Sequence, residues 1–413
     1  MNILYICDQV GSPEMGMVFR PYYFAREFNK LGHSTIILGS SFVHNRKQNP
    51  KITKDFEEST IDGIRYIWIK TCTYKKAFKR LKNIFSFAIK VRIHAKYIAQ
   101  KYRPDVVISA CAHNLDIYAS IKIAKYASAK LVYEVRDLWP LSPMEIGGYT
   151  KYNPFIMLVQ HAEDTAYKKA DAVVSVLPCV HEYMQSRGLD LKKLTIIPNG
   201  IAEDDWTDIS AGESLDKNLC NFIEKNQKQG KMIVGYTGAY ATTNALAFLL
   251  DAAKVVQNTN IIFILIGSGL EKERLIEKKE KLRLQNVYFF DPIPKSSIPR
   301  LLSYFDILYI GLQNHSLFRF GISPNKMMDY MMAAKPIVNA IKAGNDPISE
   351  AGCGITVEPE NPQAIADGIM KLAKLTDQER QAMGKKGREY ILKNNVYSVL
   401  VQKFLSKINK ISI

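Results

Sequence analysis

One short stretch of the sequence combines a cation, a carboxylate and a helix start. In "FGISPNKMMDYMMAAKPIV", residues 320–338, Pro324 suits the first turn of a helix because its φ is fixed and it has no N–H group to leave unbonded. Lys326 follows in that turn, and Asp329 comes three residues later on the same face. Helix starts bind phosphate through free N–H groups and the helix dipole. We expect Asn325 and Lys326 at a diphosphate and Asp329 at ribose hydroxyls; the alternative is a structural Lys–Asp pair.

Three further side chains follow apolar runs that resemble buried strands, at the sheet edge where parallel sheets bind ligands. His113 comes after "DVVISA", and Arg136 and Asp137 come after "KLVYEV". A lone histidine in a loop is also an ordinary internal hydrogen-bond partner, so that alternative stays open. Burying two charges without partners would be costly. We expect Arg136 and Asp137 to contact a bound substrate, or else to form a salt bridge that shapes their loop.

Glycines and one arginine mark the loops after the first strand of each half. Gly11, Gly16 and Arg20 border the early loop "DQVGSPEMG", and Gly238 opens the later loop "GAYATTNA". Glycine lets a backbone approach a ligand closely, although ordinary turns need it as well. We expect Gly16 and Gly238 at a phosphate-bearing ligand and Arg20 at a second substrate. Neither loop resembles a D-x-D or other divalent ligand set, so we expect no metal site.

The elements that must position these residues alternate between strands and helices. Runs such as "NILYIC", "STIILGSS" and "DVVISA" are separated by helix-length segments, and the alternation begins again at "MIVGYTG" and "IIFILIG". This pattern predicts parallel sheets covered on both faces by helices. At 413 residues the chain is too long for one core. We expect an α/β protein with two Rossmann-like domains, residues 1–203 and 204–392, and a C-terminal helix near 393–413 that packs on the first.

Composition excludes several classes of protein. With 47% hydrophobic and 23% charged residues, the chain is neither disordered nor collagen-like nor a coiled coil. Its six cysteines are scattered without C-x-x-C spacing, which supports neither a zinc site nor a disulfide framework. The apolar run after Met1 has no basic leader and ends at Asp8, unlike a signal peptide. No apolar stretch reaches the roughly 18 residues of a membrane span. We expect a cytoplasmic protein.

The positive charge is concentrated in one segment. The chain carries 56 Lys and Arg against 40 Asp and Glu, and the segment from Tyr74 to Arg103 has many basic residues interleaved with large apolar ones. A basic amphipathic helix is typical of proteins that lie on an anionic membrane surface. We expect segment 74–103 to attach the protein peripherally to a membrane; the alternative is an ordinary solvated helix face.

Several of these motifs together resemble glycosyltransferase family 4. They are "FGISPNKMMDYMMAAKPIV", "IIPNGI", "IGSG" and "FAREFNKLGHSTIILGSS", in the order that the family shows and over nearly the whole chain. "VYEVRDLWPLSPMEIGG" and "AEDTAYKKADAVVS" are similar to a subgroup regarded as L-fucosamine transferases of O-antigen and capsule assembly. The resemblance implies retaining enzymes of the GT-B fold, with two Rossmann-like domains and the active site in the cleft between them.

The resemblance also implies a reaction. An acetamido-deoxy sugar such as L-FucNAc would move from a nucleotide diphosphate, UDP by expectation, to a lipid-linked saccharide at the inner face of the cytoplasmic membrane, without a metal. His113 matches a histidine found near the donor sugar in related enzymes, and Glu358 matches a position that faces the cleft. We expect His113, Lys326 and Arg136 to serve catalysis.

The sequence departs from the family in two places. Many members carry Glu-x7-Glu in the motif; here Asp329 stands for the second acid and Gly321 for the first. Many also place Arg and Lys after the first strand of the second domain, where this chain has "GAYATTNA". We expect Lys326 to replace those cations. A catalytically silent scaffold of a polysaccharide assembly complex is therefore an alternative function.

Two other functions fit less well. A nicotinamide oxidoreductase requires G-x-G-x-x-G after the first strand, and the glycines of "DQVGSPEMG" are five residues apart. A nucleic-acid-binding protein would need aromatic stacking platforms or a recognition motif, and we find neither in the sequence.

Overall fold

Two α/β units make up the chain. The structure is a computed structural model that describes all residues except 17–18, 45, 208–214 and 412–413. Unit 1 comprises Met1–Pro198 and Tyr397–Ile413, and unit 2 comprises Asn199–Val396. The two points at which the chain passes between the units thus lie a few residues from 203/204 and 392/393, where the sequence pattern placed them.

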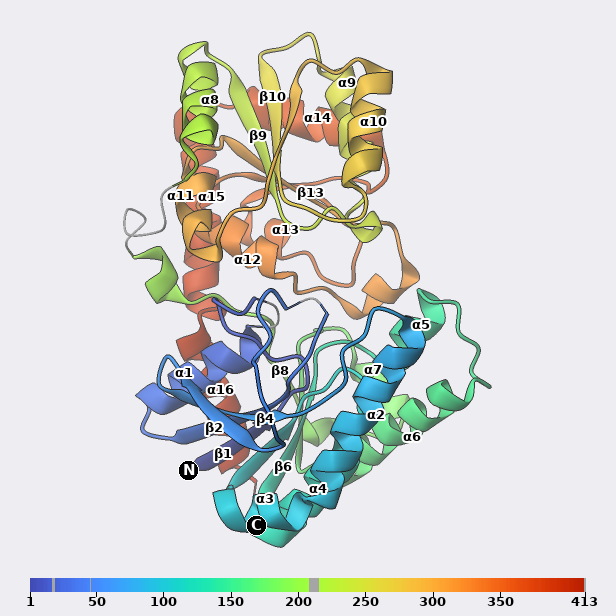
Figure 1. Cartoon of the computed structure of the whole chain (residues 1–413). Helices are drawn as coiled ribbons and strands as arrows, with labels where there is room; N and C mark the ends of the chain where they lie inside the picture. The colour runs from blue at the N-terminus through green and yellow to red at the C-terminus, as the bar shows by residue number, and fades with distance from the viewer. Residues whose placement is uncertain (17–18, 45, 208–214, 412–413) are drawn as a thin grey trace. The chain divides into compact units, whose positions relative to one another are not determined.

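Unit 1 contains an eight-stranded sheet with the order β3-β4-β2-β1-β5-β6-β7-β8 (Figure 1). All neighbouring strands are parallel except β3 and β4, which form an antiparallel hairpin at one edge. The strands are β1 (Asn2–Ile6), β2 (Ser34–Ser40), β3 (Glu57–Ile61), β4 (Ile64–Ile69), β5 (Val106–Ser109), β6 (Lys130–Val135), β7 (Ala172–Ser175) and β8 (Leu194–Ile196).

The central strands of unit 1 are short apolar runs that are buried on both faces, as a sheet between two helical layers requires. The helices are α1 (Arg20–Lys30), α2 (Ala77–Ile93), α3 (Ala95–Tyr102), α4 (Ile117–Ala127), α5 (Leu141–Glu145), α6 (Pro154–Lys169), α7 (His181–Ser186) and α16 (Tyr397–Asn409). The last of these returns from the far end of the sequence and packs on α1, where Phe404 contacts Phe24 and Phe28.

Unit 2 contains a six-stranded parallel sheet with the order β11-β10-β9-β12-β13-β14 (Figure 1). Its alternate side chains belong to two separate cores: Ile262 and Ile264 to one, Phe263 and Leu265 to the other. Both faces of the sheet are therefore covered. The strands are β9 (Met232–Thr237), β10 (Ile261–Ile266), β11 (Val287–Phe290), β12 (Ile307–Gly311), β13 (Ile337–Ala340) and β14 (Gly354–Thr356).

The helices of unit 2 divide between these two cores. Residues of α9 and α14 contribute to the core that contains Phe263, and those of α8, α11 and α12 to the core that contains Ile264. The helices are α8 (Lys217–Lys228), α9 (Leu246–Val255), α10 (Lys272–Leu282), α11 (Ile298–Ser303), α12 (Asn325–Met332), α13 (Pro347–Ala351), α14 (Pro362–Ala373) and α15 (Asp377–Asn394).

Each sheet has a point where the direction of its connections reverses. In unit 1 this point lies between β1 and β5, and in unit 2 between β9 and β12. Ligands of parallel sheets bind beyond the carboxyl ends of the strands at such points. The α/β fold of two Rossmann-like domains expected from the sequence is confirmed, and the two reversal points indicate where to look for functional residues.

Candidate functional site

In unit 2, helix α12 begins at Asn325 with its first turn open to a ligand. Pro324 is the residue before the helix, with φ −73° and ψ 134°, and no side chain among the described residues caps this helix start. The helix thus begins one residue later than the sequence analysis expects. The N–H groups of a first turn have no partner within their own helix. In α12 the N–H of Met327 donates to the carbonyl of Pro324 at 3.0 Å. The N–H groups of Asn325 and Lys326 have no side-chain cap among the described residues, and the helix dipole favours an anion beside them.

The ammonium of Lys326 is held by the end of β9 and by the loop that follows it. Its Nζ donates to the hydroxyl of Tyr236 at 2.8 Å and to Oδ1 of Asn244 at 3.0 Å. Tyr236 and Asn244 in turn donate to the same carbonyl oxygen, that of Ala239, at 2.7 and 2.9 Å. Among the described residues Lys326 has no ion pair. Burial lowers the pKa of Lys326 to about 7, so below that pH the site holds a cation that lacks a counter-charge.

Gly238 makes room for this ammonium. A Cβ added to Gly238 would lie 3.2 Å from Nζ of Lys326, and the φ of this glycine is 137°, which side chains rarely adopt. The N–H group of Thr237, one residue earlier, donates to the hydroxyl of Tyr330 of α12 at 2.8 Å. Loop and helix are therefore tied together around Lys326. The proposed contact of Gly238 with phosphate remains a prediction.

Asp329 has a different partner from the one that the sequence suggests. Both of its carboxylate oxygens accept hydrogen bonds from Nζ of Lys295, at 2.8 and 2.9 Å, and the residue is only 8% exposed. Lys295 follows β11 and opens a short 3-10 helix. The alternative of a structural pair between Lys326 and Asp329 is therefore wrong: Lys326 reaches the loop after β9, and Asp329 reaches the segment after β11.

Gly321, at the position of the missing first acid, has φ 87° and follows a 3-10 helix (Ser316–Phe320). Glycine adopts this backbone conformation without the strain that a glutamate would incur. The local turn therefore gives a physical reason for a glycine at this position.

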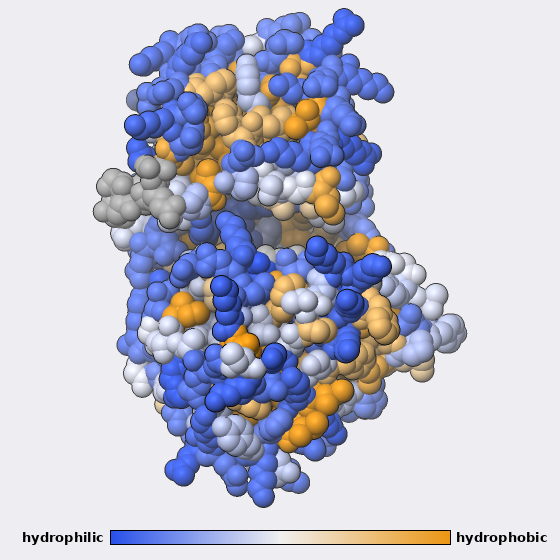
Figure 2. Space-filling view, in the orientation of Figure 1, coloured by the Kyte–Doolittle hydropathy of each residue, from blue (hydrophilic) through white to orange (hydrophobic). Residues whose placement is uncertain are grey.

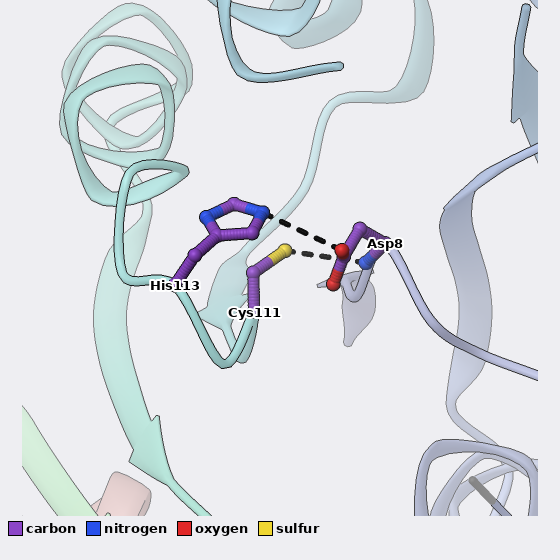
Figure 3. Close-up of side chains that lie close together, drawn as sticks. All are labelled: Asp8, Cys111 and His113. Carbon is purple, nitrogen blue, oxygen red and sulfur yellow. Dashed lines mark hydrogen bonds and ion pairs between the residues drawn. The ribbon is translucent and has the colours of Figure 1, made fainter. Parts of the chain in front are cut away.

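In unit 1, Asp8, Cys111 and His113 come together at the reversal point between β1 and β5 (Figure 3). Nε2 of His113 lies 3.4 Å from Oδ2 of Asp8, and the N–H of Asp8 donates to Sγ of Cys111 at 3.2 Å. All three residues are buried. The N–H of Leu115 donates to Nδ1 of His113 at 3.2 Å. Since Nδ1 accepts this bond, the proton of the neutral ring lies on Nε2 and faces Asp8.

The same three side chains have the donor atoms of a metal site, all within 4.8 Å of one another. One observation argues against a metal here: Nδ1 of His113 accepts from the N–H of Leu115, so the proton of the neutral ring lies on Nε2, the nitrogen that faces Asp8. The geometry fits a hydrogen-bonded cluster better than a set of metal ligands.

Arg136 and Asp137 do not form the salt bridge considered above. Nη2 of Arg136 donates to the carbonyl of Ala110 at 2.5 Å, which places Arg136 beside the strand end that leads to His113. Asp137 is exposed, and its Oδ1 accepts from the N–H of Leu138 at 2.9 Å and from the hydroxyl of Ser142 at 2.6 Å. Arg136 therefore joins the His113 region, whereas Asp137 shapes the turn before α5.

Arg20 differs most from its expected role. Its side chain is 3% exposed and pairs with the buried carboxylate of Glu134. Its remaining nitrogens donate to the carbonyls of Pro198 at 2.6 Å and Ile197 at 2.9 Å. The expected contact with a second substrate is contradicted, because Glu134 and these two carbonyls occupy its guanidinium. Arg20 holds the end of unit 1 at the point where the chain leaves it.

The remaining marked residues have local explanations. Gly16 has φ 74°, and its N–H donates to the carbonyl of Ser12 at 2.9 Å, so a turn requires this glycine. Gly11 accepts from the hydroxyl of Tyr66 at 3.2 Å. Glu358 and Asn325 are exposed. A ligand contact of Gly16 or Asn325 remains a prediction.

Sequence reasoning missed five residues of these sites. Asp8 and Cys111 lie in stretches that the strand ends pointed to, yet nothing in the sequence paired them. Tyr236 resembles a strand-core tyrosine, Asn244 a turn residue, and Lys295 one of many surface lysines. Only the fold shows which of these side chains meet.

Comparison with known families matches both units. Residues 16–200 match the model of the glycosyl transferase 4-like domain, and residues 221–390 match that of the glycosyl transferases group 1. A relative at 22% identity over 305 residues, 70% of this chain and 71% of its own, is WcaI of Escherichia coli strain K12, a proposed glycosyl transferase of colanic acid biosynthesis.

Solved structures share the fold. Sucrose-phosphate synthase of Thermosynechococcus elongatus aligns over 99% of both chains with a TM-score of 0.73 and 15% identity. Anabaena HepE in complex with UDP-glucose aligns over 99% of both, with a TM-score of 0.68 and 15% identity. The Escherichia coli trehalose-6-phosphate protein, bound with UDP-2-fluoro glucose, aligns over 100% of both chains, with a TM-score of 0.73 and 10% identity.

The described residues contain no helix that is both long and apolar enough to cross a membrane.

The two family matches together span most of the sequence and fall one on each unit. Because each unit matches a glycosyl transferase model, the chain is a glycosyltransferase, and its fold is of the GT-B type.

Proposed function

We propose that this enzyme transfers a sugar from a UDP-linked donor to a lipid-linked saccharide in the synthesis of a surface polysaccharide. Unit 2 would bind the donor and unit 1 the acceptor. The similarity to WcaI supports a polysaccharide product, and the resemblance of the sequence to L-fucosamine transferases favours an N-acetylated deoxy-amino sugar such as L-FucNAc. The reaction would take place at the cytoplasmic face of the membrane.

The observation that carries this proposal is the unpaired ammonium of Lys326 beside the start of α12. Lys326, the uncapped N–H groups of Asn325 and Lys326, and the glycine loop at Gly238 offer a cation and backbone donors at one place. This set suits a diphosphate. HepE and the trehalose-6-phosphate protein, which share the fold, have structures in complex with UDP-glucose and with UDP-2-fluoro glucose, respectively.

The chemistry required of the protein is charge stabilisation. When the bond from the sugar to the β-phosphate breaks, negative charge grows on the departing diphosphate, and Lys326 and the helix start would stabilise it. The acceptor hydroxyl attacks the face that the diphosphate leaves, and its proton passes to a phosphate oxygen. No protein base is needed for this retaining transfer. We assign His113 and Arg136 of unit 1 to the sugar.

Ligand binding tests the donor class first. UDP should raise the melting temperature of the purified protein, and a ligand at 100 times its Kd adds about 2.7 kcal/mol of stability. The shift should be unchanged by a chelator because no metal is proposed. If only another nucleoside diphosphate stabilises the protein, UDP is the wrong donor; an absolute need for a divalent cation would contradict the metal-free mechanism.

Turnover then separates an enzyme from a silent scaffold. Nucleotide sugars that stabilise the protein should be hydrolysed slowly by it, and transferred faster when a lipid-linked saccharide is supplied. Release of UDP that depends on Lys326 supports the enzyme. Stabilisation without release of UDP, with or without an acceptor, would support the scaffold that the missing acid at Gly321 suggests.

A further inference from the structure

The solvent-facing side of α2 carries apolar side chains. Phe78, Ile89 and Ile93 are 78%, 51% and 70% exposed, and the half-buried Phe85 lies on the same side. These positions are spaced by seven, four and four residues, which places them on one face of a helix. The core-facing side of α2 is already apolar, with Ile84, Phe87 and Val91 buried among others. The exposed side of α2 thus carries large apolar side chains, which an ordinary solvated helix face lacks.

A second exposed apolar group belongs to the segment between α5 and α6 and to the first turn of α6. Ile146, Tyr149 and Tyr152 are 52%, 50% and 75% exposed, and Met157 is 57% exposed. Contiguous exposed apolar residues on a water-soluble unit indicate a binding surface.

The two groups are neighbours in unit 1. The ring of Phe85 in α2 contacts that of Phe155 at the start of α6, with ring centres 6.2 Å apart. Phe155 also contacts Trp139. Phe155 follows Tyr152 by three residues, and Phe85 follows Phe78 by seven. In Figure 2 hydrophobic residues gather over α2 and between α2 and α6, beside hydrophilic ones. We call these residues of α2 and of 146–157 together the α2–α6 surface.

The charge beside this surface is mainly positive. Residues 74–103 contain ten Lys or Arg and no acid, and the acids nearest in sequence to residues 146–162 are Glu145 and Glu163. Lys90 and Lys101 pair with Asp55 and Glu58 of the β3 region, whereas Lys75, Lys76, Lys79 and Lys82 are exposed before and on α2. A binding partner must therefore offer both an apolar region for the exposed side chains and negative charge for the lysines.

We propose that the α2–α6 surface docks on an anionic lipid bilayer, with Phe78, Ile89, Ile93, Tyr149 and Tyr152 at the level of the headgroups. Tyrosines suit the boundary between water and lipid because one end of the ring is apolar and the other polar. Lysines extend to the phosphates while their stems cover apolar surface. The proposal rests on the proposed function, because docking on a membrane would bring the enzyme to a lipid-linked acceptor. Compared with the basic helix alone, the docking surface now includes the segment 146–157.

Vesicle sedimentation with the full chain tests this proposal. The protein should bind vesicles of phosphatidylcholine with phosphatidylglycerol more tightly than vesicles of phosphatidylcholine alone, and salt should weaken the binding. Two variants separate the two parts of the surface: Phe78→Ser with Ile93→Ser for α2, and Tyr149→Ser with Tyr152→Ser for the α5–α6 segment. Each should lower the partition coefficient at least tenfold. Replacing Lys75, Lys76, Lys79 and Lys82 by Glu should lower it by at least fivefold per residue on anionic vesicles, since each cation contributes about 1 kcal/mol there.

A matched control removes exposed apolar residues elsewhere. Leu270 in unit 2 and Leu31 in unit 1 are 100% and 49% exposed, and Leu270→Ser with Leu31→Ser should leave vesicle binding unchanged. Unchanged vesicle binding in the Tyr149/Tyr152 variant would contradict a role for segment 146–157. An equal loss of vesicle binding in the control variant would contradict the proposal as well. Binding to RNA homopolymers with no binding to vesicles would show that the surface recognises nucleic acid instead. The UDP-induced shift in melting temperature, measured in parallel, should persist in every variant. If the native protein shows no such shift, the proposed donor is wrong, but the result of vesicle binding still tests the membrane proposal by itself.

Discussion

The ammonium of Lys326 lies 2.8 Å from the hydroxyl oxygen of Tyr236 and 4.5 Å from the centre of the same ring, so one tyrosine holds this cation in two ways. The ring quadrupole and the hydroxyl both favour a positive charge there. The lysine is fixed in place before any donor arrives. A preorganised cation of this kind lowers the energy of a transition state without the cost of reorientation.

Lys326→Ala should therefore lower kcat by roughly 10²- to 10³-fold, the effect of removing one preorganised donor from a charge-stabilising site. The charge of the diphosphate grows as the sugar leaves, so kcat should fall more than donor affinity. Steady-state kinetics on the transfer reaction measure both. Tyr236→Phe is the matched control: it keeps the ring and removes one hydrogen bond, and its effect should be far smaller. Turnover of Lys326→Ala within twofold of the native enzyme would remove Lys326 from the mechanism.

The affinity for UDP should fall as the pH rises above 7. Burial lowers the pKa of Lys326 to about 7, and a bound diphosphate favours the charged form and raises it again. Below pH 7 the free enzyme already carries the ammonium. Above pH 7 the amine must take up a proton when UDP binds, so the Kd for UDP should rise by up to tenfold for each pH unit. Calorimetric titration between pH 6.5 and 9, in buffers of different ionisation enthalpy, measures the affinity and the proton uptake.

The control for this pH dependence is Lys326→Arg, whose guanidinium stays protonated throughout the range. Its Kd should not rise with pH. A native enzyme with the same flat profile as the arginine variant would mean that Lys326 is charged at every pH tested.

Asp329→Asn should chiefly raise the KM for the donor. A hydrogen bond to a charged group contributes about 1.5–3 kcal/mol, so a carboxylate that accepts from ribose hydroxyls should give roughly a 10- to 100-fold change in KM and little change in kcat. Because Lys295 holds Asp329 in the free enzyme, Lys295→Met tests whether that contact orients the carboxylate. A shift in KM for Lys295→Met with none for Asp329→Asn would exclude the ribose role.

Arg20→Met should destabilise the protein, with little effect on chemistry beyond that. The change leaves the carboxylate of Glu134 buried without its cation, and breaking a buried pair costs about 3–5 kcal/mol. Denaturant unfolding measures the loss. The double variant Arg20→Met with Glu134→Gln should recover part of it because the uncompensated charge is gone. A stable Arg20→Met protein with a raised KM for the acceptor would restore the substrate role that the sequence suggested.

The alternation of strands and helices is readable from the sequence because parallel strands buried on both faces are uniformly apolar. The "IIFILI" of β10 is an example, with all six residues buried. The antiparallel strand β3, "EESTI", escaped notice because its polar edge position leaves no apolar run. Strand ends also located the loops around His113 and Gly238.

The sequence does not show which side chains from distant segments contact one another. Lys326 and Asp329 are three residues apart, yet one reaches the end of β9 and the loop after it, and the other the segment after β11. Arg20 is polar and near a functional loop, and only the position of the buried Glu134 near the end of β6 shows why Arg20 is buried. Spacing along the chain predicts which residues share an element, whereas contacts depend on which strands are adjacent in the sheet.

The return of α16 to unit 1 has a consequence for biosynthesis. The aromatic side of α1, with Tyr23, Phe24 and Phe28, is covered by Tyr397 and Phe404 of α16, which the ribosome makes after the whole of unit 2. During translation unit 2 can complete its own core first, while unit 1, although begun earlier, keeps this aromatic side uncovered. The nascent chain thus presents α1 to chaperones for the time needed to synthesise nearly two hundred residues, and truncations that remove α16 should be recovered mainly as aggregates.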